Sequence, residues 1–250
     1  MPRGIKLDGQ WYPAVVLRLG KKSAQIGIEG VEDDEDGHWI PSRDVAWASK
    51  QSADGSLGPK AKRASDLLSL GDVVLVRALL DKEGAFERWS LRQVSEVQGA
   101  FMAMDVNTGR VISMQGGFSY EASVYNRATQ ADRQPGSSFK PFVYAAALDS
   151  GYSPATIVID APIEIDTPQG LWTPRNSSDK FYGPTPLRTG IEQSRNLMTI
   201  RLAQEVGMDV IGDYAERFGV YDRMNPFLAN SLGAQETTLY KMVAAYAMFA

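Results

Sequence analysis

Residues 133–141 read Arg-Gln-Pro-Gly-Ser-Ser-Phe-Lys-Pro and place Ser137 three positions before Lys140. Proline and glycine interrupt the preceding chain, and the almost wholly apolar run 142–148, closed by Gly151, predicts a helix. Side chains at positions i and i+3 lie on the same face of a helix, one turn apart. The spacing therefore predicts that the hydroxyl of Ser137 and the amine of Lys140 can reach each other.

This pair is a candidate nucleophile and base. The chain contains one histidine, His38, in a distant acidic stretch, which argues against a triad of serine, histidine and aspartate. A lysine base must lose its proton near neutral pH, so its ordinary pKa of about 10.4 must fall to about 7. Burial, neighbouring positive charge and the positive end of a helix all lower a lysine pKa, and we expect such surroundings for Lys140.

Ser194 and Asn196 form a second candidate pair. Residues 187–193 and 197–206 predict two helices, and Ser-Arg-Asn interrupts them. Taken alone, this pattern favours a helix cap and a turn. In the company of a serine and lysine pair, however, a short interruption can present two small polar side chains to a cleft instead of along a helix face.

In their order along the chain, these motifs resemble the transpeptidase domain of class A penicillin-binding proteins, from about residue 99 to residue 250. The segments that carry the resemblance are YNRATQ at 125–130, RQPGSSFKP at 133–141, GPTPLR at 183–188, QSRN at 193–196 and SLGAQE at 231–236. The resemblance implies that Ser137 attacks a D-alanyl-D-alanine carbonyl with Lys140 as base. Which group takes the first proton is disputed in this superfamily, so the role of Lys140 is a hypothesis. The resemblance also implies that Ser194 relays a proton to the leaving group and that Asn196 holds the substrate's peptide carbonyl.

The implied function is that of a peptidoglycan D,D-transpeptidase, which cross-links stem peptides in cell-wall synthesis through a serine acyl-enzyme. Water would compete as acceptor, β-lactam antibiotics would acylate the same serine, and no organic cofactor or metal is expected. The family also implies a bifunctional parent with a glycosyltransferase domain and a membrane anchor, at the periplasmic face of the inner membrane. The family's K-T-G motif does not occur before Ala250, so we expect an internal fragment of a longer protein that is incomplete as an enzyme.

The first part of the chain, residues 1–97, is predicted to form a small β-barrel. Apolar, partly alternating segments bounded by turn residues read as strands at 11–19, 23–28, 73–79 and 86–94. The segment 52–65, rich in glycine, serine, lysine and aspartate, predicts a loop. This part resembles the OB-like domain of class A penicillin-binding proteins of Gram-negative bacteria, which implies an outer-membrane lipoprotein activator as a candidate partner.

An OB-type barrel also suggests nucleic-acid binding. The chain has 30 acidic and 26 basic residues, a net charge of −4, which argues against a groove that follows phosphates. A barrel that docks a protein or acts as a spacer is therefore favoured, and no nucleic acid is expected. The acidic run 32–37 has the spacing of a calcium loop, but Arg43 stands where the closing glutamate belongs, which favours a solvated loop.

The second part, residues 98–250, opens with the strongest hairpin signal of the chain. Strand-like segments 100–106 and 110–116 flank the turn Asn-Thr-Gly at 107–109. The predicted fold class is thus α+β, with an OB-like barrel followed by a partial penicillin-binding, serine β-lactamase-like α/β domain. With 44% apolar residues, 250 residues suffice for two cores. The chain has no cysteine, no apolar run of about 18 residues for a membrane span and no signal peptide at its start.

Two other functions remain open from the sequence. A serine β-lactamase or β-lactam sensor shares the S-x-x-K pattern, and a short-lived acyl-enzyme would identify the β-lactamase. A non-catalytic envelope interaction module built around the barrel is the second alternative. The simultaneous presence of Ser137, Lys140, Ser194 and Asn196 argues against it.

Overall fold

The chain divides into two compact units, which are described separately. The computed structural model describes residues 11–32, 35–120, 123–168 and 170–250. The first unit comprises residues 1–98 and 118–124, and the second comprises residues 99–117 and 125–250. Each unit contains its own cluster of buried apolar side chains.

The first unit is a small antiparallel barrel. Its sheet has the strand order β3-β2-β1-β6-β7, and the outermost strands β3 and β7 contact each other, so that the barrel nearly closes. The strands are β1 (Trp11–Leu19), β2 (Ser23–Ile28), β3 (His38–Pro41), β6 (Val73–Leu80) and β7 (Phe86–Arg92). The barrel and the four strands expected from the apolar segments are confirmed.

Alternation along β1 and β2 determines which side chains fill the barrel. Val16 pairs with Ile26 across the two strands, and both side chains are buried. In β2 every second residue points inward, the pattern of a strand with one solvated face. On β7, buried Trp89 donates a hydrogen bond from its indole N–H to Nδ1 of His38 at 3.2 Å, which links opposite edges of the sheet.

One loop prediction in this unit was wrong. The segment 52–65 contains β5 (Leu57–Lys60), which pairs with β4 (Ser49–Gln51). Its last two residues belong to the 3₁₀ helix η2 (Ala64–Asp66). A second 3₁₀ helix, η1 (Ser42–Asp44), follows β3. The β4–β5 pair is short and mostly exposed, so it lacks the alternation that reveals a half-buried strand. Part of the suggested calcium loop, residues 33 and 34, lies outside the described residues.

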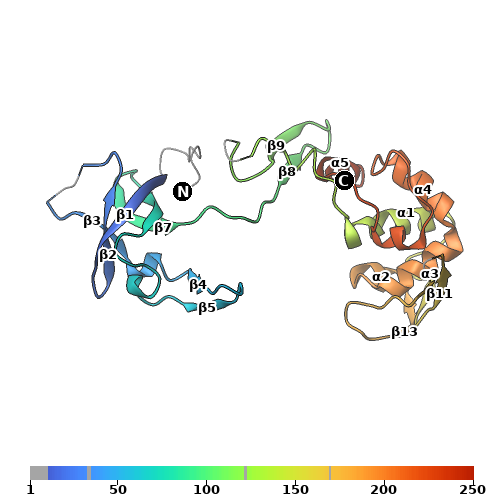
Figure 1. Cartoon of the computed structure of the whole chain (residues 1–250). Coiled ribbons are helices and arrows are strands. Elements are labelled where there is room, and N and C mark those ends of the chain that lie inside the picture. Colours follow the sequence, from blue (N-terminus) through green and yellow to red (C-terminus); the bar gives the residue numbers. More distant parts are fainter. Residues whose placement is uncertain (1–10, 33–34, 121–122, 169) are drawn as a thin grey trace. The chain divides into compact units, whose positions relative to one another are not determined.

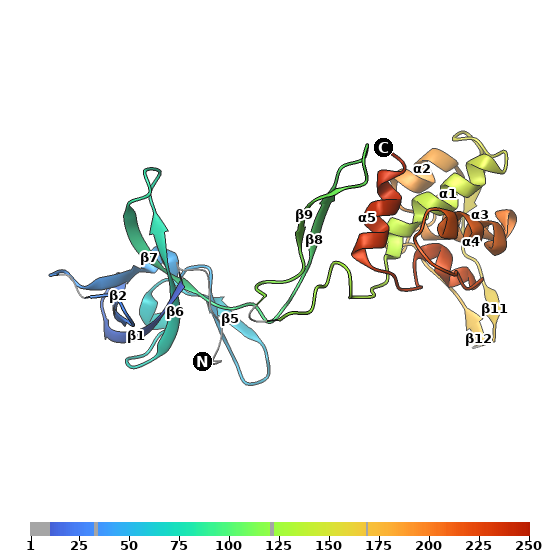
Figure 2. The ribbon, with the colours of Figure 1, turned by 90° about the horizontal axis from the view of Figure 1, so that it is seen from above.

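The second unit begins with the predicted hairpin, which is confirmed as β8 (Phe101–Met104) and β9 (Val111–Gln115). The α-helices of this unit are α1 (Lys140–Asp149), α2 (Leu187–Glu192), α3 (Asn196–Val206), α4 (Met208–Arg217) and α5 (Leu239–Ala247). Both views place α1 among the other helices, and it contacts α2, α3 and α4 (Figures 1 and 2). The helices predicted around residues 194–196 are confirmed as α2 and α3.

Two short 3₁₀ helices and two small sheets complete the second unit. The 3₁₀ helices are η3 (Gly136–Phe139) and η4 (Leu228–Leu232), and the strands are β10 (Ile157–Asp160), β11 (Ile165–Thr167), β12 (Gly170–Trp172) and β13 (Gly183–Pro186). β10 pairs with β13, which directly precedes α2, whereas β11 and β12 form a separate hairpin (Figure 2). Within the described ranges, none of the helices combines the length and apolar character that a bilayer crossing requires.

Candidate active site

The turn that carries Ser137 begins with a glycine in the left-handed backbone region. Gly136 has φ +55°, a conformation that costs glycine little because it has no Cβ. η3 then leads directly into α1, and the backbone N–H of Lys140 donates to the carbonyl of Ser137. The expected helical turn between the two residues is therefore present. Ser137 is exposed, whereas Lys140 is only 1% exposed.

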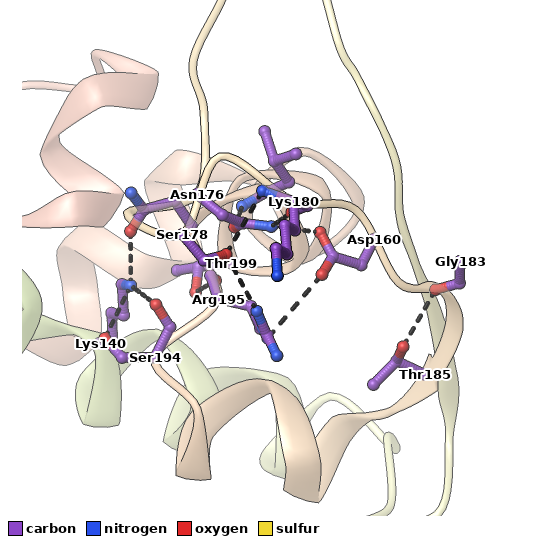
Figure 3. Close-up of polar contacts among 12 residues, drawn as sticks. Lys140, Asp160, Asn176, Ser178, Lys180, Gly183, Thr185, Ser194, Arg195 and Thr199 are labelled. Atoms are coloured by element: carbon purple, nitrogen blue, oxygen red, sulfur yellow. Dashed lines mark hydrogen bonds and ion pairs between the residues drawn. The ribbon is translucent and has the colours of Figure 1, made fainter.

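The buried amine of Lys140 points to the connection between α2 and α3 (Figure 3). Its Nζ donates to the backbone oxygen of Ser194 at 2.7 Å, to the Ser194 hydroxyl at 3.0 Å and to Oδ1 of Asn196 at 2.7 Å. An ammonium group has three N–H donors, and these three acceptors satisfy all of them. The site thus joins side chains that are 54 and 56 residues apart in sequence.

Burial lowers the pKa of Lys140 from 10.5 to about 8. Withdrawal from water disfavours the charged form of an amine, so the shift has the direction that a base near neutral pH requires. Once the amine is neutral, it has two N–H groups and one lone pair. A carbonyl oxygen cannot donate to that lone pair, so the Ser194 hydroxyl is the partner that can. Of the three partners of Lys140, the Ser194 hydroxyl alone can both accept a hydrogen bond from the amine and donate one to it.

A strained backbone residue creates the interruption between the two helices. Ser194 has φ +51°, the left-handed region that a residue with a Cβ rarely adopts. Hydrogen bonds from the N–H of Ser194 to Ile191 at 3.1 Å, and from the N–H of Arg195 to Gly190 at 2.9 Å, close the end of α2. Asn196 is the first residue of α3, and its Nδ2 donates to the carbonyl of Arg175 at 2.9 Å.

A segment near the C-terminal end of the chain also supports the turn before Ser137. Gly233 follows η4 with φ +75°, and its carbonyl accepts a hydrogen bond from the N–H of Gly136 at 3.1 Å. Thr237, four residues after Gly233, exchanges two backbone hydrogen bonds of 2.9 and 3.0 Å with Arg133. The segment SLGAQE at 231–236 therefore supports the backbone of the Ser137 turn.

Of the four predicted site residues, three are joined by hydrogen bonds: Lys140, Ser194 and Asn196. Ser137 lies one turn before Lys140, and its hydroxyl makes no hydrogen bond to any described residue. The amine of Lys140 is thus hydrogen-bonded to residues of the α2–α3 connection, whereas Ser137 is exposed.

Sequence reasoning missed a polar group on the other side of this connection. Asp160, at the end of β10, is fully buried and lies near Asn176 and Arg195 (Figure 3). One signal was available, because in Ile-Val-Ile-Asp at 157–160 an aspartate shares the strand face of a valine, which is the buried face. Among the described residues, histidine, aspartate and glutamate do not gather in groups of three or more that could hold a metal.

Comparison with protein families gives one match for each of the two parts of the chain. A model described as the penicillin-binding protein transpeptidase domain matches residues 99–250. A model described as the penicillin-binding protein OB-like domain matches residues 2–97.

Curated relatives match along most of the chain. Penicillin-binding protein 1A of Rickettsia bellii is 41% identical over 239 residues, which cover 95% of this chain and 28% of the relative. Penicillin-binding protein 1A of Vibrio cholerae is 39% identical over 247 residues, covering 97% of this chain and 29% of the relative. The chain therefore spans less than a third of the length of these relatives.

Solved structures give the same picture. The crystal structure of penicillin-binding protein 1A from Haemophilus influenzae superposes with a TM-score of 0.80 at 32% identity, covering 99% of this chain and 34% of that chain. A penicillin-binding protein from Mycobacterium tuberculosis shares the fold over 62% of this chain and 42% of its own, with a TM-score of 0.55 at 24% identity.

Proposed function

Because this chain belongs to the penicillin-binding protein transpeptidase family, we propose that it forms part of a peptidoglycan D,D-transpeptidase of the penicillin-binding protein 1A type. Its substrates are stem peptides that end in D-alanyl-D-alanine, and β-lactam antibiotics acylate it. We further propose an OB-like domain over residues 1–97 and a transpeptidase domain over residues 98–250. The proposed whole protein also carries a glycosyltransferase domain and a membrane anchor, and acts at the periplasmic face of the inner membrane.

The observation that most supports this proposal is the environment of Lys140. Its amine is buried and contacts both Ser194 and Asn196, one turn after an exposed serine. Burial lowers the pKa of this amine to about 8, so that about a tenth of the molecules carry it neutral at pH 7. A buried lysine with a lowered pKa beside hydroxyl groups is suited to proton transfer in acyl chemistry.

In the proposed mechanism, the Ser137 hydroxyl attacks the carbonyl of the terminal peptide bond. Lys140 in its neutral form accepts the serine proton. The Ser194 hydroxyl then gives its own proton to the departing nitrogen and takes the proton held by Lys140, so that both groups return to their starting state. The carbon–nitrogen bond breaks, D-alanine leaves, and an ester to Ser137 remains. An amine of a neighbouring stem peptide then attacks the ester carbonyl. The new carbon–nitrogen bond forms the cross-link, the ester bond to Ser137 breaks, and a proton lost by the amine restores the Ser137 hydroxyl. Asn196 holds the peptide carbonyl of the substrate and accepts from Lys140.

Covalent labelling tests this function. This chain and the full-length protein that the gene encodes are incubated with a fluorescent penicillin, and the adduct is mapped by mass spectrometry. We expect a stable adduct on Ser137 of the full-length protein, which Ser137→Ala abolishes. Folded protein without an adduct would contradict the proposal and would favour a non-catalytic module. An adduct that is lost within seconds would favour a β-lactamase.

The barrel carries a separate proposal about a partner. The OB-like unit has its own core, and an outer-membrane lipoprotein activator is the partner that family resemblance suggests. We expect the full-length protein to retain such a lipoprotein on an affinity matrix. Deletion of residues 11–92 should abolish retention without preventing acylation of Ser137.

A further inference from the structure

The carboxylate of Asp160 is a buried charge that the proposed mechanism does not use. Asp160 ends β10, where it pairs with Gly183 of β13. Its side chain is 0% exposed. Burial of a charged carboxylate costs free energy unless hydrogen bonds or an opposite charge compensate for the lost water. The neighbours of Asp160 therefore indicate its role.

One carboxylate oxygen holds the loop that precedes β13. Oδ1 accepts a hydrogen bond of 2.7 Å from Nδ2 of Asn176, which is itself 4% exposed. Oδ1 of Asn176 in turn accepts from the backbone N–H of Leu197 at 3.3 Å, in the first turn of α3. The preceding carbonyl, that of Arg175, accepts from Nδ2 of Asn196 at 2.9 Å. Asp160 is therefore tied, through this loop, to the residue that contacts Lys140.

The other carboxylate oxygen faces Arg195. Oδ2 lies 3.9 Å from Nε of Arg195, and neither atom has a hydrogen-bond partner among the described residues. The guanidinium lies 3.5 Å above the ring of Tyr182, and its side chain is 13% exposed. Ring and carboxylate together fix the arginine side chain, and Arg195 directly follows the strained Ser194 in the chain. The second arm of the network thus reaches the other partner of Lys140.

We propose that Asp160 is a positioning residue of this site: through Asn176 and Arg195 it orients Asn196 and Ser194 toward the amine of Lys140. The inference rests on the proposed function, since it assigns Asp160 a part in acyl transfer. Asp160 touches neither Lys140 nor Ser137 and acts through the two residues that flank Arg195. Arg195, which lies between Ser194 and Asn196 in the chain, thereby has a positioning role of its own.

The ion pair can be tested with a change that preserves shape. Asp160→Asn keeps an oxygen for Asn176 but removes the charge opposite Arg195. Labelling of the full-length protein by a fluorescent penicillin is followed over time at several concentrations. The amplitude gives the fraction of folded, competent molecules, and the saturating rate constant gives the acylation step. We expect full amplitude and an acylation rate constant lower by on the order of 10- to 100-fold, because a displacement of about 1 Å has that effect.

The arginine supplies a second, independent variant. Arg195→Gln should lower the rate constant to a similar extent. The double variant should be slower than either single variant by no more than about twofold, because each change removes the same ion pair. If Asp160→Asn fails to fold, the acylation rate constant of Arg195→Gln alone tests the proposal, and an unchanged rate constant would contradict it. Losses that multiply in the double variant would overturn the proposed coupling.

Thr185→Val is a matched control on the same two-stranded sheet. Thr185 is 7% exposed, and its hydroxyl donates to the carbonyl of Gly183 at 3.0 Å, away from Asn176 and Arg195 (Figure 3). This variant should keep both the amplitude and the rate constant. If Asp160→Asn lowers the amplitude and leaves the rate constant unchanged, the residue only supports folding and the proposal fails. If the wild-type protein shows no adduct on Ser137, the proposed function fails, and this inference fails with it.

Discussion

Gly233 lies against the backbone of Gly136, although the two residues are almost a hundred positions apart. A Cβ on Gly233 would come within 2.6 Å of the nitrogen of Gly136, closer than carbon and nitrogen can approach without displacement. The same pair shares a hydrogen bond from the N–H of Gly136 to the carbonyl of Gly233 at 3.1 Å. The turn that presents Ser137 is therefore held by a contact that leaves no room for a Cβ on Gly233.

Replacement of Gly233 should lower the free energy of unfolding. Gly233→Ala adds a left-handed alanine at φ +75° and a clash with backbone, so we expect a loss of roughly 2–5 kcal/mol in the free energy of unfolding. Gly151→Ala is the matched control, because Gly151 has φ +93° and nothing within 4 Å of an added Cβ. The control should lose about 1–2 kcal/mol. Urea unfolding measures both, and equal losses would contradict the steric argument.

The pKa of Lys140 predicts the pH dependence of acylation. With a pKa of about 8, the neutral fraction of the amine rises with pH and levels off above that value. The acylation rate constant for a penicillin should therefore rise through pH 8 and reach a plateau. Lys140→Arg, which keeps the charge at all accessible pH values, should lower the rate constant by on the order of 10²- to 10⁴-fold and remove the rise. A wild-type profile that is flat from pH 6 to 10 would count against Lys140 as the base.

The same group should make stability depend on pH. The folded-state pKa of about 8 lies below the ordinary value of 10.5, so the folded protein binds fewer protons than the unfolded protein between these values. Stability then rises with pH across this window, and the penalty for burying the charge is fully present below it. Relative to Lys140→Met, wild-type protein should gain up to about 3 kcal/mol between pH 7 and 10.5. A difference that stays constant in denaturant titrations would refute the assignment.

Two replacements at Ser194 separate its backbone from its hydroxyl. Both Ser194→Ala and Ser194→Gly remove the hydroxyl that contacts Lys140 at 3.0 Å, so both should slow acylation alike. Only glycine relieves the strain at φ +51°, so Ser194→Gly should be more stable than Ser194→Ala by about 1 kcal/mol. Thermal unfolding and labelling rates are the measurements. A glycine variant that labels much faster than the alanine variant would shift the role of Ser194 from hydroxyl to backbone.

The two cores predict that damage to the barrel leaves the second unit intact. Trp89 is 5% exposed in the first core, and Trp89→Ala should destabilise the barrel by about 3–5 kcal/mol. Phe86→Ala on the same strand is the control, because Phe86 is 53% exposed and should cost less than about 1 kcal/mol. Circular dichroism in urea should show an earlier β transition for Trp89→Ala alone. Labelling of Ser137 should persist in both variants, and its loss in Trp89→Ala would show that the barrel supports the site.

The elements of this fold could largely be predicted from sequence because their signals are local. Alternation of apolar residues identified the barrel strands, a turn motif identified the β8–β9 hairpin, and a three-residue interruption separated α2 from α3. The β4–β5 pair was missed because both strands are short and mostly exposed to solvent. Their residues therefore show no alternation of apolar and polar side chains that would predict a strand. Sequence patterns of this kind predict the backbone conformation of a segment and which of its faces is buried, but not which segments pair with each other.

The sequence by itself determined which residues were candidates: a serine and a lysine one turn apart, and a serine and an asparagine at a break between helices. Their catalytic roles remain predictions. Only the tertiary structure decided that Lys140 bonds to Ser194 and Asn196, that Asp160 is buried behind them, and that Gly233 packs on Gly136. These contacts join residues that lie about 35 to 97 positions apart in the sequence, beside the core around α1. Burial of that kind, which also sets the pKa of Lys140, is a property of packing that no spacing along the chain encodes.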